Sequence, residues 1–240
     1  MTNTRTVSDA KRAFYTLHTR PINSVYRRVV DELMVEMHLL TVNSGFVYTP
    51  IYALGVVTAY DRFMKGYRPD SDHTSIFSAL CKSVESDPAQ LRTDRDKLVA
   101  SLDGLTWDGL TSGSVSAELQ SEMSTIAGNA KFKYSRLFAI GLYTLLETID
   151  PDKLKDKEAL NAVLEKVAGA LNLSFDKVQK DLEIYQNNLE KMAAAQIVMA
   201  DILAADRKKR DQREQEKIAR AEAKKLEAAS ETETPETTAA

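Results

Sequence analysis

Apolar residues near the C-terminus recur at alternating steps of four and three, and this spacing constrains the fold more than any other feature. A repeat of 3.5 residues is typical of α-helices that pack along a seam. The series has glutamine as its one polar member and runs Val178, Leu182, Tyr185, Leu189, Met192, Gln196, Met199 and Leu203. We predict one long helix over residues 174–228, whose first half packs on other elements and whose second half projects into water.

The second half of this helix is highly charged. Residues 206–227 hold nine basic and six acidic side chains and no continuing apolar seam. Opposite charges four residues apart favour an exposed helix, and we expect ion pairs of this kind at Asp206–Arg210, Arg210–Glu214 and Glu216–Arg220. Residues 229–240 are acidic and poor in large apolar side chains, which predicts a disordered tail.

The rest of the chain shows helical periodicity and no strand-like alternation. One apolar stripe steps by four and three through Tyr26, Val30, Leu33, Met37 and Leu40. Only nine glycines and six prolines occur in 240 residues, which also favours helix. The sequence therefore predicts an all-α fold, with a multi-helix globular bundle over residues 1–173.

Capping residues and prolines predict where the helices begin. Ser8 is a suitable N-cap, Pro21 suits a first helical position, and Thr49 followed by Pro50 combines both signals. Three further helices are expected at about 114–129, 132–149 and 156–171, of which the second is the most apolar. Residues 103–113 contain three glycines and predict a loop whose Trp107 packs back onto the core.

The segment DELMVEMH, residues 31–38, is the best candidate for chemistry. Glu32 and Glu36 share a helical face, but Glu36 and His38 are only two apart and so point about 200° away from each other. A metal pair on one helix would need a spacing of three. Arg27 and Arg28 lie one turn before Asp31 and Glu32, which favours ion pairs on a polar surface that also includes His38.

Other signs of catalysis are missing from the sequence. Cys81 is the single cysteine and fits a small core thiol, and no phosphate-binding glycine loop or nucleophile-elbow pattern occurs. The formal net charge is −3, which argues against nucleic acid as a partner. We expect no catalytic residues, metal or cofactor, no signal or transit peptide, and no transmembrane helix.

Residues 6–40, TVSDAKRAFYTLHTRPINSVYRRVVDELMVEMHLL, closely resemble the thylakoid formation protein family, whose members are also described as photosystem II accessory factors. The resemblance continues through YTPIYALGVVTAYDRFMKGYRP, residues 48–69, and IFSALC, residues 76–81. It extends in character to about residue 220. It implies a cyanobacterial-type, non-enzymatic factor in thylakoid biogenesis, with photosystem II assembly and repair machinery and FtsH-type membrane proteases as partners.

The resemblance further implies a position on the cytoplasmic side of the thylakoid membrane, soluble or peripherally attached. We expect partner contacts on the polar face of the second helix and on the charged C-terminal helix: Arg27, Arg28, Asp31, Glu32, Val35, Leu39, Arg207, Lys208, Lys209, Arg210, Arg213 and Arg220. Two alternatives stay open. One is a lipid or pigment carrier, and the other is a carboxylate-metal enzyme using Glu32, Glu36 and His38.

Overall fold

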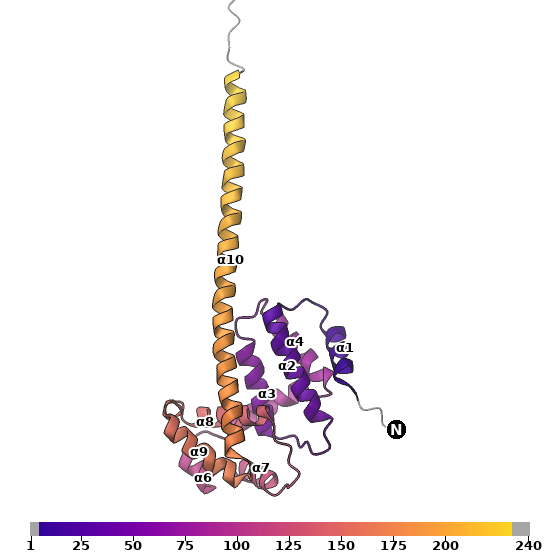
Figure 1. The fold of residues 1–240 in the computed structure, drawn as a ribbon, viewed down its shortest axis with the longest axis vertical. Helices are drawn as coiled ribbons and strands as arrows, with labels where there is room; N and C mark the ends of the chain where they lie inside the picture. Colours follow the sequence, from indigo (N-terminus) through magenta and orange to yellow (C-terminus); the bar gives the residue numbers. More distant parts are fainter. Residues whose placement is uncertain (1–4, 232–240) are drawn as a thin grey trace, which may run out of the picture. The chain divides into compact units, whose positions relative to one another are not determined.

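The computed structural model describes residues 5–231, with side chains to residue 221. All regular secondary structure within these residues is helical, which confirms the all-α prediction (Figure 1). The elements are α1 Val7–Leu17, α2 Ser24–Thr41, α3 Pro50–Phe63, α4 Ser71–Ser83, α5 Pro88–Ala100, α6 Trp107–Ser112, α7 Ala117–Ala127, α8 Arg136–Ile149, the 3₁₀ turn η1 Lys153–Lys155, α9 Lys157–Ala170 and α10 Phe175–Glu231.

Side-chain caps set most helix starts, although two predicted starts are wrong. Helix α1 is capped by Thr6, whose hydroxyl and backbone N–H form a reciprocal capping box with Asp9, so Ser8 already lies inside the helix. Helix α2 begins after its cap Asn23, and Pro21 precedes it in the linker. The predicted start of α3 at Thr49 is confirmed.

Helices α3 and α8 form the centre of the core. Every residue from 51 to 60 and from 137 to 146 is buried, which confirms the prediction for the apolar segment around α8. The helices cross where each carries a glycine. A Cβ on Gly55 would lie 1.8 Å from the carbonyl oxygen of Leu137, and one on Gly141 would lie 1.9 Å from that of Ile51. Glycine is therefore required at both positions because the two backbones touch.

The segment predicted as a loop over residues 103–113 contains a short helix, α6. Thr106 caps it and Gly113, with φ of 80°, ends it. A residue in this left-handed conformation cannot continue an α-helix, and glycine adopts it without steric strain, so α6 ends here. Trp107 is buried as predicted, and its indole N–H donates to the Leu146 carbonyl at 2.9 Å. The small helix therefore anchors the loop to α8.

Helix α10 extends through two compact units, of which the first ends at Met192 and the second begins at Ala193. Val178, Leu182, Tyr185 and Met192 of the apolar seam are buried within the first unit. Every described side chain from residue 201 to 221 is exposed. The predicted domain boundary at 173 and the projection of the helix stay predictions. The helix reaches Glu231, past the predicted start of the tail at 229, and residues 232–240 lie outside the described residues.

Candidate functional site

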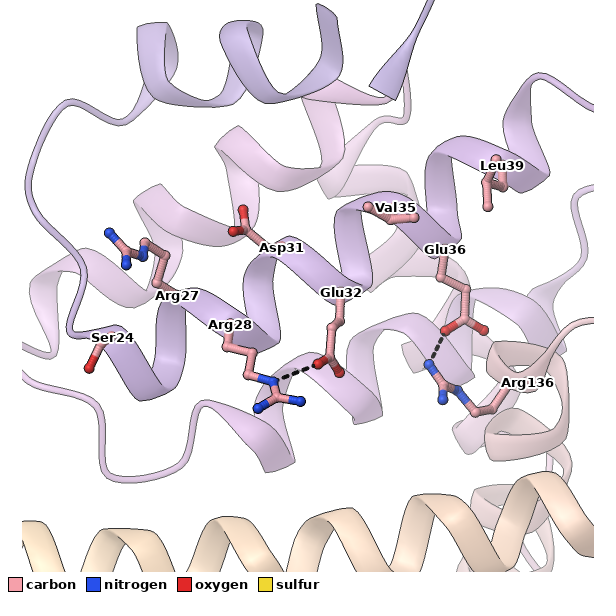
Figure 2. Close-up of a pocket in the computed structure, with 9 residues that line it drawn as sticks. All are labelled: Ser24, Arg27, Arg28, Asp31, Glu32, Val35, Glu36, Leu39 and Arg136. Atoms are coloured by element: carbon pink, nitrogen blue, oxygen red, sulfur yellow. Dashed lines mark hydrogen bonds and ion pairs between the residues drawn. The ribbon is translucent and has the colours of Figure 1, made fainter. Parts of the chain in front are cut away.

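The exposed face of α2 borders an open hollow of about 670 Å³ in the first unit (Figure 2). Six of its nine lining residues are the α2 side chains expected to contact a partner. Ser24 and Glu36 of the same helix and Arg136 of α8 complete it; the full set is Ser24, Arg27, Arg28, Asp31, Glu32, Val35, Glu36, Leu39 and Arg136. The structure therefore brings together the predicted α2 residues and adds one residue that lies 100 positions away in the sequence.

Ion pairs on this face differ in part from those expected. Arg28 donates to Glu32 at 3.0 Å, as its spacing of four predicts. Asp31, however, pairs with Lys11 of α1 at 3.1 Å and not with Arg27. Asp31 therefore joins α1 to α2. Arg27 is left without a carboxylate partner among the described residues.

Glu36 connects α2 to the first turn of α8. One carboxylate oxygen lies 2.6 Å from the Arg136 guanidinium, and the other accepts the Leu137 backbone N–H at 3.2 Å. Ser135 caps the same helix end by accepting from the N–H of Phe138. Because the N-terminus of a helix carries partial positive charge, a carboxylate here is stabilising. Glu36 is thus structural as well as surface-lining, which its sequence neighbours did not indicate.

His38 is not part of this polar surface, and its predicted position was wrong. Only 4% of His38 is exposed, on the side of α2 that faces the core. Glu32 points outward and Glu36 is bonded to α8, so these three residues do not converge. Within residues 5–231 no group of three or more His, Cys, Asp or Glu side chains could hold a metal ion.

Two apolar side chains stand among the charges of this face. Val35 is 36% exposed and Leu39 is 57% exposed. They are four residues apart, so they lie one above the other on the helix. In Figure 2 both lie along the same stretch of α2 as Glu36, whose side chain reaches Arg136. Exposed apolar side chains grouped inside a polar rim are typical of protein interaction sites.

A second hollow of about 480 Å³ continues the first past the end of α2. The two share Glu36, Leu39 and Arg136. The second adds side chains from the segment before α8 and from the start of α10, namely Lys133, Tyr134, Ser135, Lys177 and Asp181, together with Leu40 and Asn43. Sequence reasoning missed these residues, because only the fold brings three distant segments together.

Other basic residues near the N-terminus are in ion pairs, most of them partly exposed. Four of them have acidic partners besides the Arg28–Glu32 pair: Arg5 with Glu85, Lys11 with Asp31, Arg12 with Asp9 and Arg20 with Asp72. Asp72 is buried, and Arg20 reaches it at 2.6 Å. Of these pairs Lys11–Asp31 joins two helices directly, whereas Arg5 and Arg20 lie in the segments flanking α1.

The predicted contact residues of the second unit are all exposed: Arg207, Lys208, Lys209, Arg210, Arg213 and Arg220. The expected pairs Asp206–Arg210, Arg210–Glu214 and Glu216–Arg220 do not form, since no ion pair involves the described side chains from 193 to 221. These exposed side chains remain hydrated because pairing them would gain little free energy. No helix among residues 5–231 combines the length and apolar character that crossing a membrane requires.

Comparison with known proteins gives consistent results over nearly the whole chain. A family model described as Thylakoid formation protein matches residues 6–214. Protein Thf1 of Nostoc punctiforme is 56% identical over 226 residues, covering 91% of this chain and 96% of that protein. Protein Thf1 of Acaryochloris marina is 53% identical, covering 88% of each chain. The solved structure of Psb29 superimposes with a TM-score of 0.74 at 44% identity, covering 86% of this chain and 98% of that one.

Proposed function

Because this chain belongs to the thylakoid formation protein family, we propose that it is a non-enzymatic interaction factor in thylakoid biogenesis and in photosystem II assembly and repair. The name of the family model supports the first role. The fold of this chain resembles the solved structure of Psb29 over most of both chains, which supports a comparison of the two proteins. The proposal assigns the chain a binding role, in which surfaces matter and no residue performs chemistry.

The exposed face of α2 carries this proposal. Its charged side chains surround two exposed apolar ones, Val35 and Leu39, beside an open hollow. A folded chain gains nothing from keeping Leu39 57% exposed, whereas a partner that covers it removes apolar area from water. Protein interfaces commonly have such an apolar centre with a polar rim.

The proposed partner is an FtsH-type membrane protease complex, whose accumulation the chain would support. Binding would take place on the cytoplasmic side of the thylakoid membrane, with the chain attached peripherally. The exposed basic side chains of the second unit, from Arg207 to Arg220, offer a further surface for an acidic partner or for anionic lipid.

Affinity purification from thylakoid extracts tests this function. The tagged full chain is expected to enrich an FtsH-type protease. Val35→Asp with Leu39→Asp should abolish that enrichment, because it places two charges at the apolar centre of the contact. Leu17→Asp is the matched control, since Leu17 is 50% exposed on α1 and does not line either hollow of the α2 face. All variants should keep the wild-type melting temperature.

Two results would reject parts of this proposal. If the wild-type chain never enriches the protease, the assigned partner is wrong. If the double variant on α2 retains the protease as fully as Leu17→Asp does, the α2 face is not the contact surface. Equal loss with Leu17→Asp would likewise remove the support for α2, since the effect would then not depend on position.

A further inference from the structure

We infer that the two hollows beside α2 form one groove and that it binds an amphipathic protein helix with an apolar centre and acidic residues toward both ends. This inference rests on the proposed function, because it assigns a partner chemistry to the same face. Three features of the surface support it: the spacing of the exposed apolar side chains, the internal bonds of the carboxylates, and the positions of the cations that have no carboxylate partner.

The apolar part of the groove follows helical spacing. Val35 and Leu39, which line the groove, are four apart, and Val42, the C-cap residue of α2, follows three residues later, is 41% exposed and lies outside the lining of both hollows. Steps of four and three place the three side chains in one row along α2, the arrangement that another helix packs against. Helix-in-groove binding uses this geometry. The row therefore favours a helical occupant over an irregular loop.

All four carboxylates lining the groove are already engaged by the fold. Three are in ion pairs, Asp31 with Lys11, Glu32 with Arg28 and Glu36 with Arg136. The fourth, Asp181, accepts a hydrogen bond from the Tyr134 hydroxyl at 2.8 Å. A basic partner would have to compete with these internal bonds. The groove therefore offers few acceptors to positive charge.

Three cations at its ends have no acidic partner among the described residues. Arg27 lies toward the start of α2, while Lys133 and Lys177 lie beyond its end. Lys177 sits 4.8 Å from the centre of the Tyr134 ring, a cation–π contact, and is in no ion pair with a described carboxylate. From Arg27 to the last residue of α2, Thr41, the helix rises about 21 Å, so a partner helix of about four turns would reach both ends.

A second copy of the chain does not fit this pattern. Pairing two such faces antiparallel would set Arg27 of each copy against Lys133 and Lys177 of the other. Pairing them parallel would set each cation against its own equivalent. Both arrangements place like charges opposite each other, which opposes association. Charge complementarity thus selects a different molecule, with acidic residues at the two ends of its binding segment.

Site-specific photocrosslinking captures the occupant of the groove directly from a mixture of thylakoid proteins. Benzoylphenylalanine replaces Leu39 in the full chain, the chain is irradiated in thylakoid extract, and mass spectrometry locates the crosslinked segment. A helical segment with net negative charge at its ends is expected. Lys133→Glu with Lys177→Glu should lower the crosslink yield by about five-fold or more, whereas Lys133→Arg with Lys177→Arg should retain it. The probe at Leu17 serves as the position control.

The outcomes separate this inference from the proposed partner. An acidic helical segment from the protease supports both, and one from another protein supports the groove chemistry while rejecting the protease. A basic segment, a segment of the same chain, an adduct with lipid, or no crosslink above the Leu17 control would overturn the inference. Equal crosslink yield from the Lys→Glu and Lys→Arg variants would also overturn it.

Discussion

Replacing Gly55 with alanine is expected to lower the free energy of unfolding by about 3 kcal/mol. The added Cβ would lie 1.8 Å from the Leu137 carbonyl oxygen and 2.9 Å from the Gly141 nitrogen. A Cβ essentially never approaches another heavy atom more closely than 3.0 Å, so α3 and α8 must separate locally by about 1.2 Å or more. The obstacle is backbone, which cannot rotate away as a side chain can.

The size of the effect follows from the packing that this separation disrupts. A radial gap of about 0.5–1 Å forfeits a quarter to a half of the dispersion energy of a contact. Both helices are buried over the whole crossing region, residues 51–60 and 137–146. We take the gross cost as about 4 kcal/mol, above the roughly 1–3 kcal/mol typical of overpacked cores, because the obstacle is backbone. Alanine has the better helix propensity by about 1 kcal/mol, which offsets part of that cost.

Gly169→Ala is the matched control. Gly169 is exposed in α9, and apart from the adjacent residues and helix backbone no atom lies within 4 Å of the position its Cβ would occupy. The same substitution there should stabilise the fold by about 0.5–1 kcal/mol. Thermal unfolding followed by the fluorescence of Trp107, the single tryptophan, compares the two variants. For a chain of this size a loss of about 3 kcal/mol lowers Tm by about 6–12 °C. A Gly55→Ala protein that melts within about 2 °C of wild type, on the order of half a kcal/mol, would refute the reasoning.

Three further predictions concern buried or partly buried side chains. Burial raises the pKa of Glu122 from 4.5 to about 7, so the stability that its protonated form contributes is full below pH 4.5 and is lost as pH rises through 7. In urea unfolding, the free energy of unfolding of Glu122→Gln should therefore exceed that of wild type by about 1–3 kcal/mol at about pH 8 but not at about pH 4.5. An equal difference at both pH values would contradict this. Trp107→Phe removes the hydrogen bond to the Leu146 carbonyl and should lower the free energy of unfolding by about 1–3 kcal/mol. Circular dichroism in urea measures this loss, and an unchanged unfolding midpoint would contradict it. Burial also raises the pKa of Cys81 to about 12, so this thiol should react with a disulfide reagent only after unfolding, and rapid reaction of the folded chain would disprove it.

Much of the fold can be predicted from the sequence because helix signals are local. The apolar stripe of α2 is buried at all five predicted positions, and Thr49 with Pro50 marks the start of α3. Local signals are less certain where two candidates compete for one cap. Thr6 forms a capping box with Asp9, so the helix starts ahead of Ser8.

The candidate site was only half predictable for a physical reason. Arg28 and Glu32 lie on one helix, and their spacing alone indicates their ion pair. Lys11 and Asp31 lie on different helices, as do Glu36 and Arg136, so their contacts depend on how helices pack. Sequence spacing on a single helix cannot show such pairs. For the same reason, the sequence alone does not place Lys133 and Lys177 at the far end of the groove.

The bond from Glu36 to the Leu137 backbone places a hydrogen-exchange reporter inside the proposed binding surface. The Leu137 amide donates to the carboxylate at 3.2 Å, and Glu36 also lines both hollows of the α2 face. Exchange of this amide requires the bond to open and water to enter. A partner lying in the groove would exclude that water and slow the exchange. Occupancy of the surface could then be followed from a single core-helix amide, with every side chain of the contact left as it is.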